Sequence, residues 1–338
     1  MEELKKKNPG LELILTFFSP SGYEIRKNYA LAKVLYLPAD LPGNAGKWIT
    51  AIKPDLAVFV KYDLWPGYLN ALISKHIPFL LMSAHFRPGT LSSWSIPPTS
   101  DLLKKAKAIF LQENHWVIEL NRKGFENIKV AGDTRIDRTL QIANETQEQM
   151  ATLHFQFGTF DLVAGSTWEE DEDILLPVIE KLKLKVMIAP HDIRESHLQK
   201  LMQQIKVPAV RLSAITKLDD SIKVLVVDSI GQLTYLYALG QMAYIGGGFG
   251  KGIHNILEPA AHHLPVIFGP RYHKFPEAEK LIQSGAAHSV NNQSALQDAI
   301  TQFSGDEGKL AGDRAFTFLE KNCGATPIIT SFIREFIN

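Results

Sequence analysis

Short apolar runs alternate with longer amphipathic segments along most of this chain, and this rhythm constrains the fold more than any other feature. Runs that are apolar on both faces and separated by helical segments are typical of parallel strands covered on both sides. They occupy residues 11–18, 34–37, 56–60, 79–83 and 108–111, and then residues 160–166, 185–190, 223–227, 242–247 and 265–270. The chain is therefore predicted to be an α/β protein with parallel sheets.

A polar segment, residues 135–156, interrupts this rhythm because it contains no strand candidate and no glycine. We interpret it as a linker helix or loop between two doubly wound halves, and a length of 338 residues suits two domains. The predicted domains are residues 1–145 and 146–325, with a terminal helix over 326–337 that packs back on the first. In such sheets ligands bind beyond the carboxyl ends of the strands, where polar residues such as His85 follow.

Charge and cysteine content exclude several classes of protein. Lysine plus arginine equals aspartate plus glutamate, 36 against 36, so we expect no nucleic-acid partner. Residues 1–150 hold 19 basic and 15 acidic side chains, a balance of +4, which suits an anionic partner. The one cysteine, Cys323, permits no intrachain disulfide, and no apolar run reaches the roughly 18–20 residues needed to span a membrane.

Five glycines fall between Gly246 and Gly252, directly after a predicted strand. The spacing matches neither the phosphate loop of nucleotide hydrolases nor the fingerprint of dinucleotide-binding domains. A tight turn needs only one or two glycines, so we interpret the run as a loop whose N–H groups approach an anionic ligand. Lys251 and His254 are candidate contacts to its phosphate.

Two interpretations of Asn255 and Glu258 remain open. Their spacing before an apolar run is that of a capping box, in which Asn255 caps the helix and Glu258 folds back on it. Alternatively, the two oxygens of Glu258 accept hydrogen bonds from the vicinal hydroxyls of a ribose. The spacing alone does not separate these possibilities.

Several segments resemble, in order along the chain, the bacterial 3-deoxy-D-manno-octulosonic acid (Kdo) transferases of lipopolysaccharide synthesis. They include "PADLPG" (38–43), "IKPDLAVFVKYDLWPGYL" (52–69), "AGSTWEEDE" (164–172) and "GGGFGKGIHNILEPAAHHLPVIFGP" (246–270). The resemblance implies the GT-B glycosyltransferase fold, in which two doubly wound Rossmann-like domains face a central cleft. It also implies transfer of Kdo from CMP-Kdo to a lipid A precursor at the cytoplasmic face of the inner membrane, with peripheral contact to anionic lipid.

The resemblance further implies roles for individual residues. The donor nucleotide CMP would be held by Gly247, Gly248, Gly250, Asn255 and Glu258, and its phosphate would be approached by Ser166 and His191. The acceptor or the sugar would face Ser19, Ser21, Gly22 and Asp63 in the first domain. Ser21 has an alternative role as the cap of the helix that follows it.

The chain departs from the family pattern at two places. Residues 189–195 are "APHDIRE" where many members have Pro-Arg-His-Pro-Glu-Arg, so Arg194 or His191 would take over the contact of the expected arginine. The general base of the family is a glutamate in a Gly-Glu loop, which we expect upstream of Met1. We therefore expect an N-terminally truncated chain with no catalytic residue of its own, and we expect no metal and no cofactor.

Three alternatives to this function remain. The chain is a GT-B enzyme that uses a UDP-sugar, such as an epimerase or a lipid-disaccharide transferase, or a two-lobed binding protein without catalytic activity. A third possibility is a truncated chain that folds poorly, with unpaired strand edges or exposed apolar surface in its first sheet.

Overall fold

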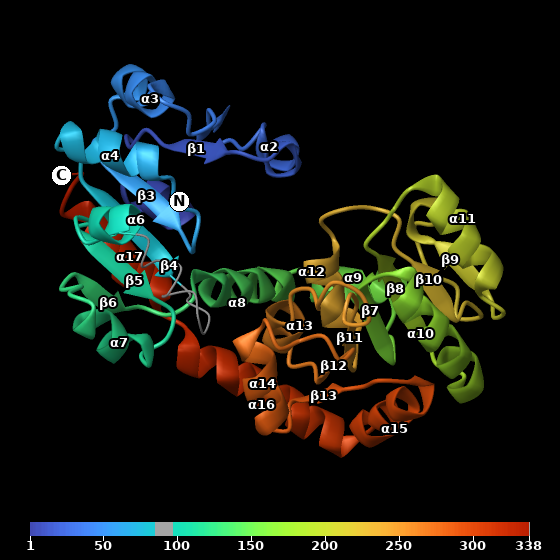
Figure 1. Ribbon diagram of the computed structural model, residues 1–338. Coiled ribbons are helices and arrows are strands. Elements are labelled where there is room, and N and C mark those ends of the chain that lie inside the picture. Colours follow the sequence, from blue (N-terminus) through green and yellow to red (C-terminus); the bar gives the residue numbers. More distant parts are fainter. Residues whose placement is uncertain (85–96, 338) are drawn as a thin grey trace. The chain divides into compact units, whose positions relative to one another are not determined.

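A computed structural model describes residues 1–84 and 97–337 (Figure 1). The chain folds into two compact units. The first contains Met1–Thr134 together with the C-terminal segment from Gly324, and the second contains Arg135–Cys323. The boundary that we predicted at residue 145 falls inside helix α8 (Thr134–Gln147), which belongs almost wholly to the second unit.

The first unit contains two parallel sheets. Strands β1 (Ile14–Phe17) and β2 (Lys33–Tyr36) pair with one another, and a four-stranded sheet has the order β3-β4-β5-β6. The four strands are Ala57–Val60, Phe79–Ala84, Ala108–Leu111 and Ile128–Val130. The described helices are α1 (Glu2–Lys7), α2 (Pro20–Arg26), α3 (Asn44–Ile52), α4 (Pro66–Ser74), α6 (Pro97–Leu103), α7 (Trp116–Arg122) and α17 (Ala325–Arg334).

Neighbouring residues of β4 and β5 point to opposite faces of the four-stranded sheet, and both faces are covered. Leu81 and Ile109 pack with residues of α3, α4, α6 and α7, whereas Leu80 and Phe110 pack with α1 and α17. Helix α17 therefore packs within the first unit, although it begins at Ala325 and the last strand of that unit ends at Val130. This is the place that the sequence predicted for the terminal helix.

The β1–β2 sheet has much less cover. Residues of β1, β2 and α2 are all partly or fully exposed, and large apolar side chains among them include Ile14, 40% exposed, and Ile25, 70% exposed. This sheet therefore exposes apolar side chains, as other parts of the first unit do at Val60 and Ile118.

The second unit is built on one parallel sheet with the order β13-β12-β11-β7-β8-β10-β9. Its strands are β7 (Leu162–Thr167), β8 (Val186–Pro190), β9 (Ala209–Arg211), β10 (Val224–Val226), β11 (Ala243–Ile245), β12 (Val266–Phe268) and β13 (Ala287–Ser289). Its helices are α8, α9 (Met150–Phe157), α10 (Glu169–Leu182), α11 (Glu195–Gln204), α12 (Leu233–Leu236), α13 (Leu257–Ala261), α14 (Pro276–Gln283), α15 (Gln293–Phe303) and α16 (Asp306–Asn322), with short 3₁₀ turns at Leu212–Ala214 and Tyr237–Leu239.

Helices cover both faces of this sheet. Val163 and Ala243 pack with α12, α13, α14 and α16, whereas Ala164 and Tyr244 pack with α10, α11 and α15. The predicted α/β class with parallel sheets is confirmed. Strands β6, β9 and β13 were absent from the prediction because their sequences, IKV, AVR and AHS, each contain a polar residue and form no continuous apolar run.

Candidate functional site

The strand order of the second unit changes direction at β7. The chain moves from β7 to β8 on one side and later returns to place β11 on the other side of β7. Ligands of doubly wound sheets bind beyond the carboxyl ends of the strands at such a point. Ser166 lies at the end of β7, and His191 and the glycine run follow β8 and β11. These three strands are adjacent, so the fold brings the predicted residues to one edge of the sheet.

Ser166 occupies an irregular point at the end of β7. Its backbone lies in the left-handed region, with φ 54°, and the pairing of β7 with β8 shifts register between Gly165 and Thr167. Bulges of this kind re-aim side chains and are frequent beside functional sites. Just beneath, the buried Glu172 accepts hydrogen bonds from Thr167 Oγ1 at 2.9 Å and pairs with His197 Nε2 at 3.2 Å, and burial raises its pKa.

Most glycines of the run have a steric reason within the chain itself. A Cβ at Gly246 would lie 2.2 Å from the carbonyl oxygen of Ser166, and one at Gly248 would lie 2.6 Å from Cα of Gly269. Gly247 and Gly252 have positive φ angles of 89° and 130°. Folding alone therefore explains most of these glycines, and the prediction that their number requires a nearby ligand was wrong. Gly250 has the most open surroundings of the five, because the nearest atom to a Cβ there would be 3.7 Å away.

A buried carboxylate that the sequence analysis missed holds this loop. Asp171, fully buried in the first turn of α10, accepts hydrogen bonds from Tyr244 Oη at 2.7 Å, from Gly247 N at 2.8 Å and from Trp168 N at 2.9 Å. Burial raises its pKa, and these hydrogen bonds oppose the shift. Asp171 is the third residue of α10, a position at which an acidic side chain often accepts a hydrogen bond from the N-cap N–H, so the bond to Trp168 N could have been predicted from the sequence. No local pattern predicted the bonds to Tyr244 of β11 and to Gly247 of the loop.

Hydrogen bonds within the chain also limit the anion site that we expected from loop N–H groups. Gly247 N donates to Asp171, and the N–H groups of Gly250 and Gly252 both donate to the carbonyl of Gly247. Arg271, which follows β12 and was not predicted, donates from Nη1 to the carbonyl of Gly250 at 2.5 Å. The loop is thus rigidly organised, and side chains around it must supply much of any contact to phosphate.

The structure excludes one of the two interpretations of Asn255 and Glu258, the capping box. Helix α13 is capped by Ile256, and Asn255 Oδ1 accepts the Leu257 N–H at 3.2 Å, so the predicted capping box is wrong. Glu258 accepts from Asn255 Nδ2 at 2.8 Å on one oxygen and from Thr234 Oγ1 at 2.9 Å on the other. The carboxylate is fixed from two sides and half-buried, and each oxygen keeps a further lone pair.

Three aromatic rings from three segments form a cluster at this edge. Trp168 and His191 stack with ring centroids 4.5 Å apart, His191 and His254 stack at 4.5 Å, and Trp168 Nε1 donates to His254 Nε2 at 3.1 Å. Burial, and then the neighbouring charge of His191, lower the pKa of His254. Lys251 lies exposed in the adjacent loop.

Arg194 does not stand free to replace the arginine of the family pattern. Its guanidinium donates to both oxygens of Asp192, with Nε at 2.9 and 3.0 Å, and this pairing lowers the pKa of Asp192 to about 2. Arg194 is therefore already paired with a carboxylate, whereas His191 stacks within the ring cluster, so His191 is the better candidate for the contact.

The predicted residues of the first unit lie after β1 and β3. The hydroxyls of Ser19 and Ser21 bond to one another at 2.7 Å. The helix cap is Ser19 rather than Ser21, so the alternative role of Ser21 is wrong. Asp63 is exposed after β3, and the neighbouring side chains Phe18 and Trp65 contact each other with ring centroids 4.8 Å apart.

Gly22 also has a packing role, because a Cβ there would lie 2.5 Å from the ring of Phe17. His85 lies outside the residues that the structure describes. The structure therefore brings the loops after β1 and β3 together through Phe18 and Trp65, while the donor-side residues belong to the second unit.

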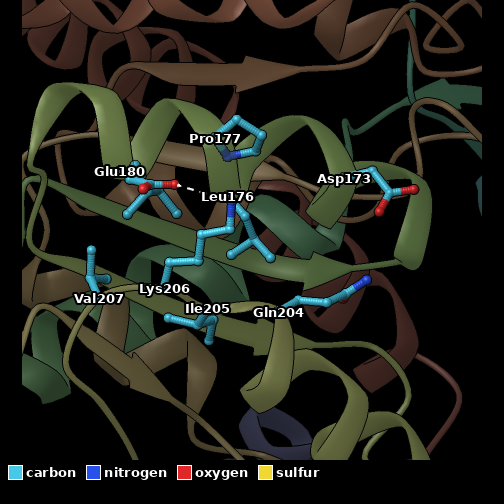
Figure 2. Close-up of a pocket in the computed structure, with 9 residues that line it drawn as sticks. Asp173, Leu176, Pro177, Glu180, Gln204, Ile205, Lys206 and Val207 are labelled. Carbon is cyan, nitrogen blue, oxygen red and sulfur yellow. Dashed lines mark ion pairs between the residues drawn. The ribbon is translucent and has the colours of Figure 1, made fainter.

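A surface hollow of the second unit lies away from these residues (Figure 2). It is lined by Asp173, Leu176, Pro177, Ile179 and Glu180 of α10 and by the segment from Gln204 to Val207. Glu180 and Lys206 form an ion pair across it at 3.9 Å. Because these segments precede strands β8 and β9, the hollow lies toward the amino ends of the strands, and none of the predicted site residues line it.

Comparison with known proteins finds sequence similarity to 3-deoxy-D-manno-octulosonic acid transferases. Residues 1–138 match the family described as 3-Deoxy-D-manno-octulosonic-acid transferase (kdotransferase). The 3-deoxy-D-manno-octulosonic acid transferase of Haemophilus influenzae is 24% identical over 100% of this chain and 83% of its own length. The enzyme of the same name from Aquifex aeolicus is 26% identical over 89% of this chain and 80% of its own length.

Solved structures support the fold. The UDP-GlcNAc 2-epimerase of Neisseria meningitidis bound to UDP-GlcNAc superposes with a TM-score of 0.65 at 17% identity, over 99% of this chain and 94% of that one. MurG of Acinetobacter baumannii gives a TM-score of 0.59 at 12% identity, over 99% and 93% of the two chains. The predicted GT-B type of fold, with two Rossmann-like domains, is thereby confirmed.

Proposed function

We propose that this chain, which is similar in sequence to the Kdo transferases, is a glycosyltransferase that moves Kdo from CMP-Kdo to a lipid A precursor. The observation that carries the proposal is the carboxylate of Glu258, fixed by Asn255 and Thr234 beside the direction change of the sheet. A rigid, two-oxygen acceptor suits the vicinal hydroxyls of a ribose. We assign CMP as the nucleotide because the chain resembles the Kdo transferases, in which CMP-Kdo is the expected donor.

The residues of the second unit would act on the leaving group. Transfer breaks the bond between the anomeric carbon of Kdo and a phosphate oxygen, so negative charge develops on CMP. Hydrogen-bond donors already held in place stabilise such charge at low reorganisation cost. We assign this role to Ser166, His191 and His254, with Lys251 as an exposed cation and Gly247, Gly248 and Gly250 as the rigid loop beside them.

The acceptor would be met by the first unit. We assign its contacts to Ser19, Ser21, Gly22 and Asp63, and we assign no general base. No helix of the described residues is both long and apolar enough to cross a membrane. We propose peripheral binding to the anionic cytoplasmic face of the inner membrane, since residues 1–150 carry an excess of four basic side chains.

Membrane binding has a direct test. We expect binding to vesicles that contain an anionic lipid, and we expect added salt to weaken it because exposed charges are screened. Sedimentation with anionic and with neutral vesicles at two salt concentrations measures this. Equal binding to both kinds of vesicle at low salt, or binding to anionic vesicles that added salt does not weaken, would count against the proposal.

The donor site is tested by calorimetry with CMP and 2′-deoxy-CMP. Charge-assisted hydrogen bonds contribute roughly 1.5–3 kcal/mol, so Glu258→Gln should weaken CMP binding by about tenfold or more. The parent should prefer CMP over the deoxy nucleotide, and the variant should discriminate less. If the variant keeps the parent's preference, Glu258 does not bind the ribose.

A UDP-sugar enzyme is the second candidate, because the epimerase named above shares the fold over nearly the whole chain. Competition between CMP and UDP for the same site separates the two candidates. Displacement of bound CMP by equimolar UDP would favour the second candidate. A transfer assay with CMP-Kdo and a lipid A precursor then tests the reaction itself.

A further inference from the structure

The ring cluster contains a hydrogen bond whose direction is fixed by chemistry. The indole nitrogen of Trp168 is a donor only, and it lies 3.1 Å from Nε2 of His254. Nε2 must therefore accept, and it carries no proton while this bond exists. A neutral His254 then has its single proton on Nδ1.

The surroundings favour the neutral form of His254. The ring lies half-buried and stacks on His191 with an angle of 23° between the planes. Protonation would place the second N–H hydrogen of the ring on Nε2, facing the indole N–H, and would break the bond. Charged side chains on the neighbouring loops already make hydrogen bonds within the chain. Asp171 accepts from Gly247 N, and Asp192 accepts from Arg194 Nε. Arg271 donates to the carbonyl oxygen of Gly250.

We propose that Trp168 is a positioning residue of the donor site: its indole N–H keeps His254 in the Nδ1-protonated neutral form. Among the described residues no hydrogen bond uses His254 Nδ1, so this N–H is available to an anionic oxygen. The inference rests on the proposed function, because the anionic oxygen is that of the donor phosphate. It deepens that function, since the site then meets phosphate through a fixed neutral donor at His254, with His191 stacked beside it.

Packing alone is the competing explanation of Trp168. Its ring stacks on His191 and is 36% exposed, so an aromatic side chain without an N–H should fit the same place. Trp168→Phe is therefore the matched variant, because it keeps a stacking ring and removes only the donor. The backbone bond from Trp168 N to Asp171 is unaffected by this change.

The first measurement is the tautomer of His254 without ligand, from the nitrogen chemical shifts of protein labelled at histidine. The signals are assigned by their loss in His254→Asn. We expect the parent to show the Nδ1-protonated form and Trp168→Phe to show a mixture of both tautomers. An unchanged tautomer in Trp168→Phe would overturn the proposal.

The second measurement is CMP affinity of the same proteins. Only the Nδ1-protonated fraction of His254 can donate to a charged oxygen, so a mixture of tautomers in Trp168→Phe should weaken CMP binding by about two- to fivefold. A changed tautomer with unchanged CMP affinity would overturn the role of Trp168 in the donor site. If the parent itself does not bind CMP while its tautomer is as expected, the proposed function fails, and the hydrogen bond of Trp168 to His254 still stands.

Discussion

The β1–β2 sheet of the first unit and the seven-stranded sheet of the second are both parallel, but their cover differs. Every residue of β8 is buried, and in β7 only Ser166 is partly exposed. No residue of β1 or β2 is buried. Parallel strands are stable when both faces are covered. The donor-side residues are thus mounted on the better-packed sheet, and Ser19, Ser21 and Gly22 on the less packed one.

Two serines at strand ends make a second comparison. Ser83 at the end of β4 and Ser166 at the end of β7 have nearly equal φ angles, 51° and 54°, and each lies at a register shift. Ser83 is 1% exposed and bonds to Thr134 Oγ1 at 3.2 Å. The hydroxyl of Ser166 makes no hydrogen bond to a described residue, so the same backbone feature serves packing in one unit and leaves a polar group open in the other.

The largest expected effect contrasts one glycine from each unit. Gly248→Ala would place Cβ 2.6 Å from the backbone of Gly269, which the buried sheet holds in place. Overpacking costs about 1–3 kcal/mol and occasionally more, and we expect at least about 3 kcal/mol here because backbone must move. Gly22→Ala meets only the ring of Phe17, which is not buried, and alanine favours the helix.

Hydrogen exchange at β7 and β11 measures the first change, and exchange at β1 and β2 measures the second. We expect Gly22→Ala to lie within about 1 kcal/mol of the parent. Gly250→Ala serves as control within the loop, because its nearest atom is at 3.7 Å. Equal destabilisation by Gly248→Ala and Gly250→Ala would refute the steric explanation of the glycine run.

A smaller effect is expected when one hydroxyl is removed from each unit. Tyr244→Phe deprives the buried carboxylate of Asp171 of one donor, whereas Tyr68→Phe deprives the Pro38 carbonyl of one. Bonds to charged groups contribute about 1.5–3 kcal/mol and bonds between neutral groups about 0.5–1.5 kcal/mol. Unfolding in urea should therefore show a larger loss for Tyr244→Phe, and the reverse order would contradict the importance of Asp171.

The dependence of stability on pH gives a third test, confined to the second unit. Burial lowers the pKa of His262, whose Nε2 lies 2.8 Å from the Thr234 carbonyl. The folded state then binds fewer protons than the unfolded state, so stability falls as pH drops below about 6.5. His262→Gln should flatten this slope by no more than about 1.4 kcal/mol per pH unit.

The measurement compares the two proteins at each pH between 7.5 and 5.5. Burial raises the pKa of Asp171 and Glu172, which contributes a slope of opposite sign. That contribution is common to parent and variant, so the difference between them isolates His262. Identical slopes would show that His262 does not titrate with folding.

The smallest effect is expected on CMP affinity when a hydroxyl of the first unit is removed. Ser21→Ala removes a hydroxyl bonded to Ser19 on the exposed sheet of the first unit. CMP affinity should stay within about twofold of the parent, because the donor residues belong to the other unit. The KM for the lipid acceptor should rise instead, and a drop in CMP affinity would show that the two groups of residues are not separate in function.

The sequence by itself determined the class of fold and the positions of the longer strands. The apolar runs at 56–60, 79–83 and 108–111 became β3, β4 and β5, because strands covered on both faces need apolar side chains throughout. It also determined that Ser166 and His191 lie at the carboxyl ends of predicted strands. These are local properties: an apolar run forms a strand where it stands in the sequence, and the residues after it lie at the end of that strand.

Only the tertiary structure decided how those residues are held. Asp171 bonds to Gly247 across 76 positions of sequence, and Trp168 bonds to His254 across 86. Glu258 accepts a hydrogen bond from Thr234, 24 positions earlier in the sequence, as well as from Asn255 beside its own helix. No local pattern predicts such partners, because they depend on which strands become neighbours in the sheet and on where the connections between the strands place the following loops.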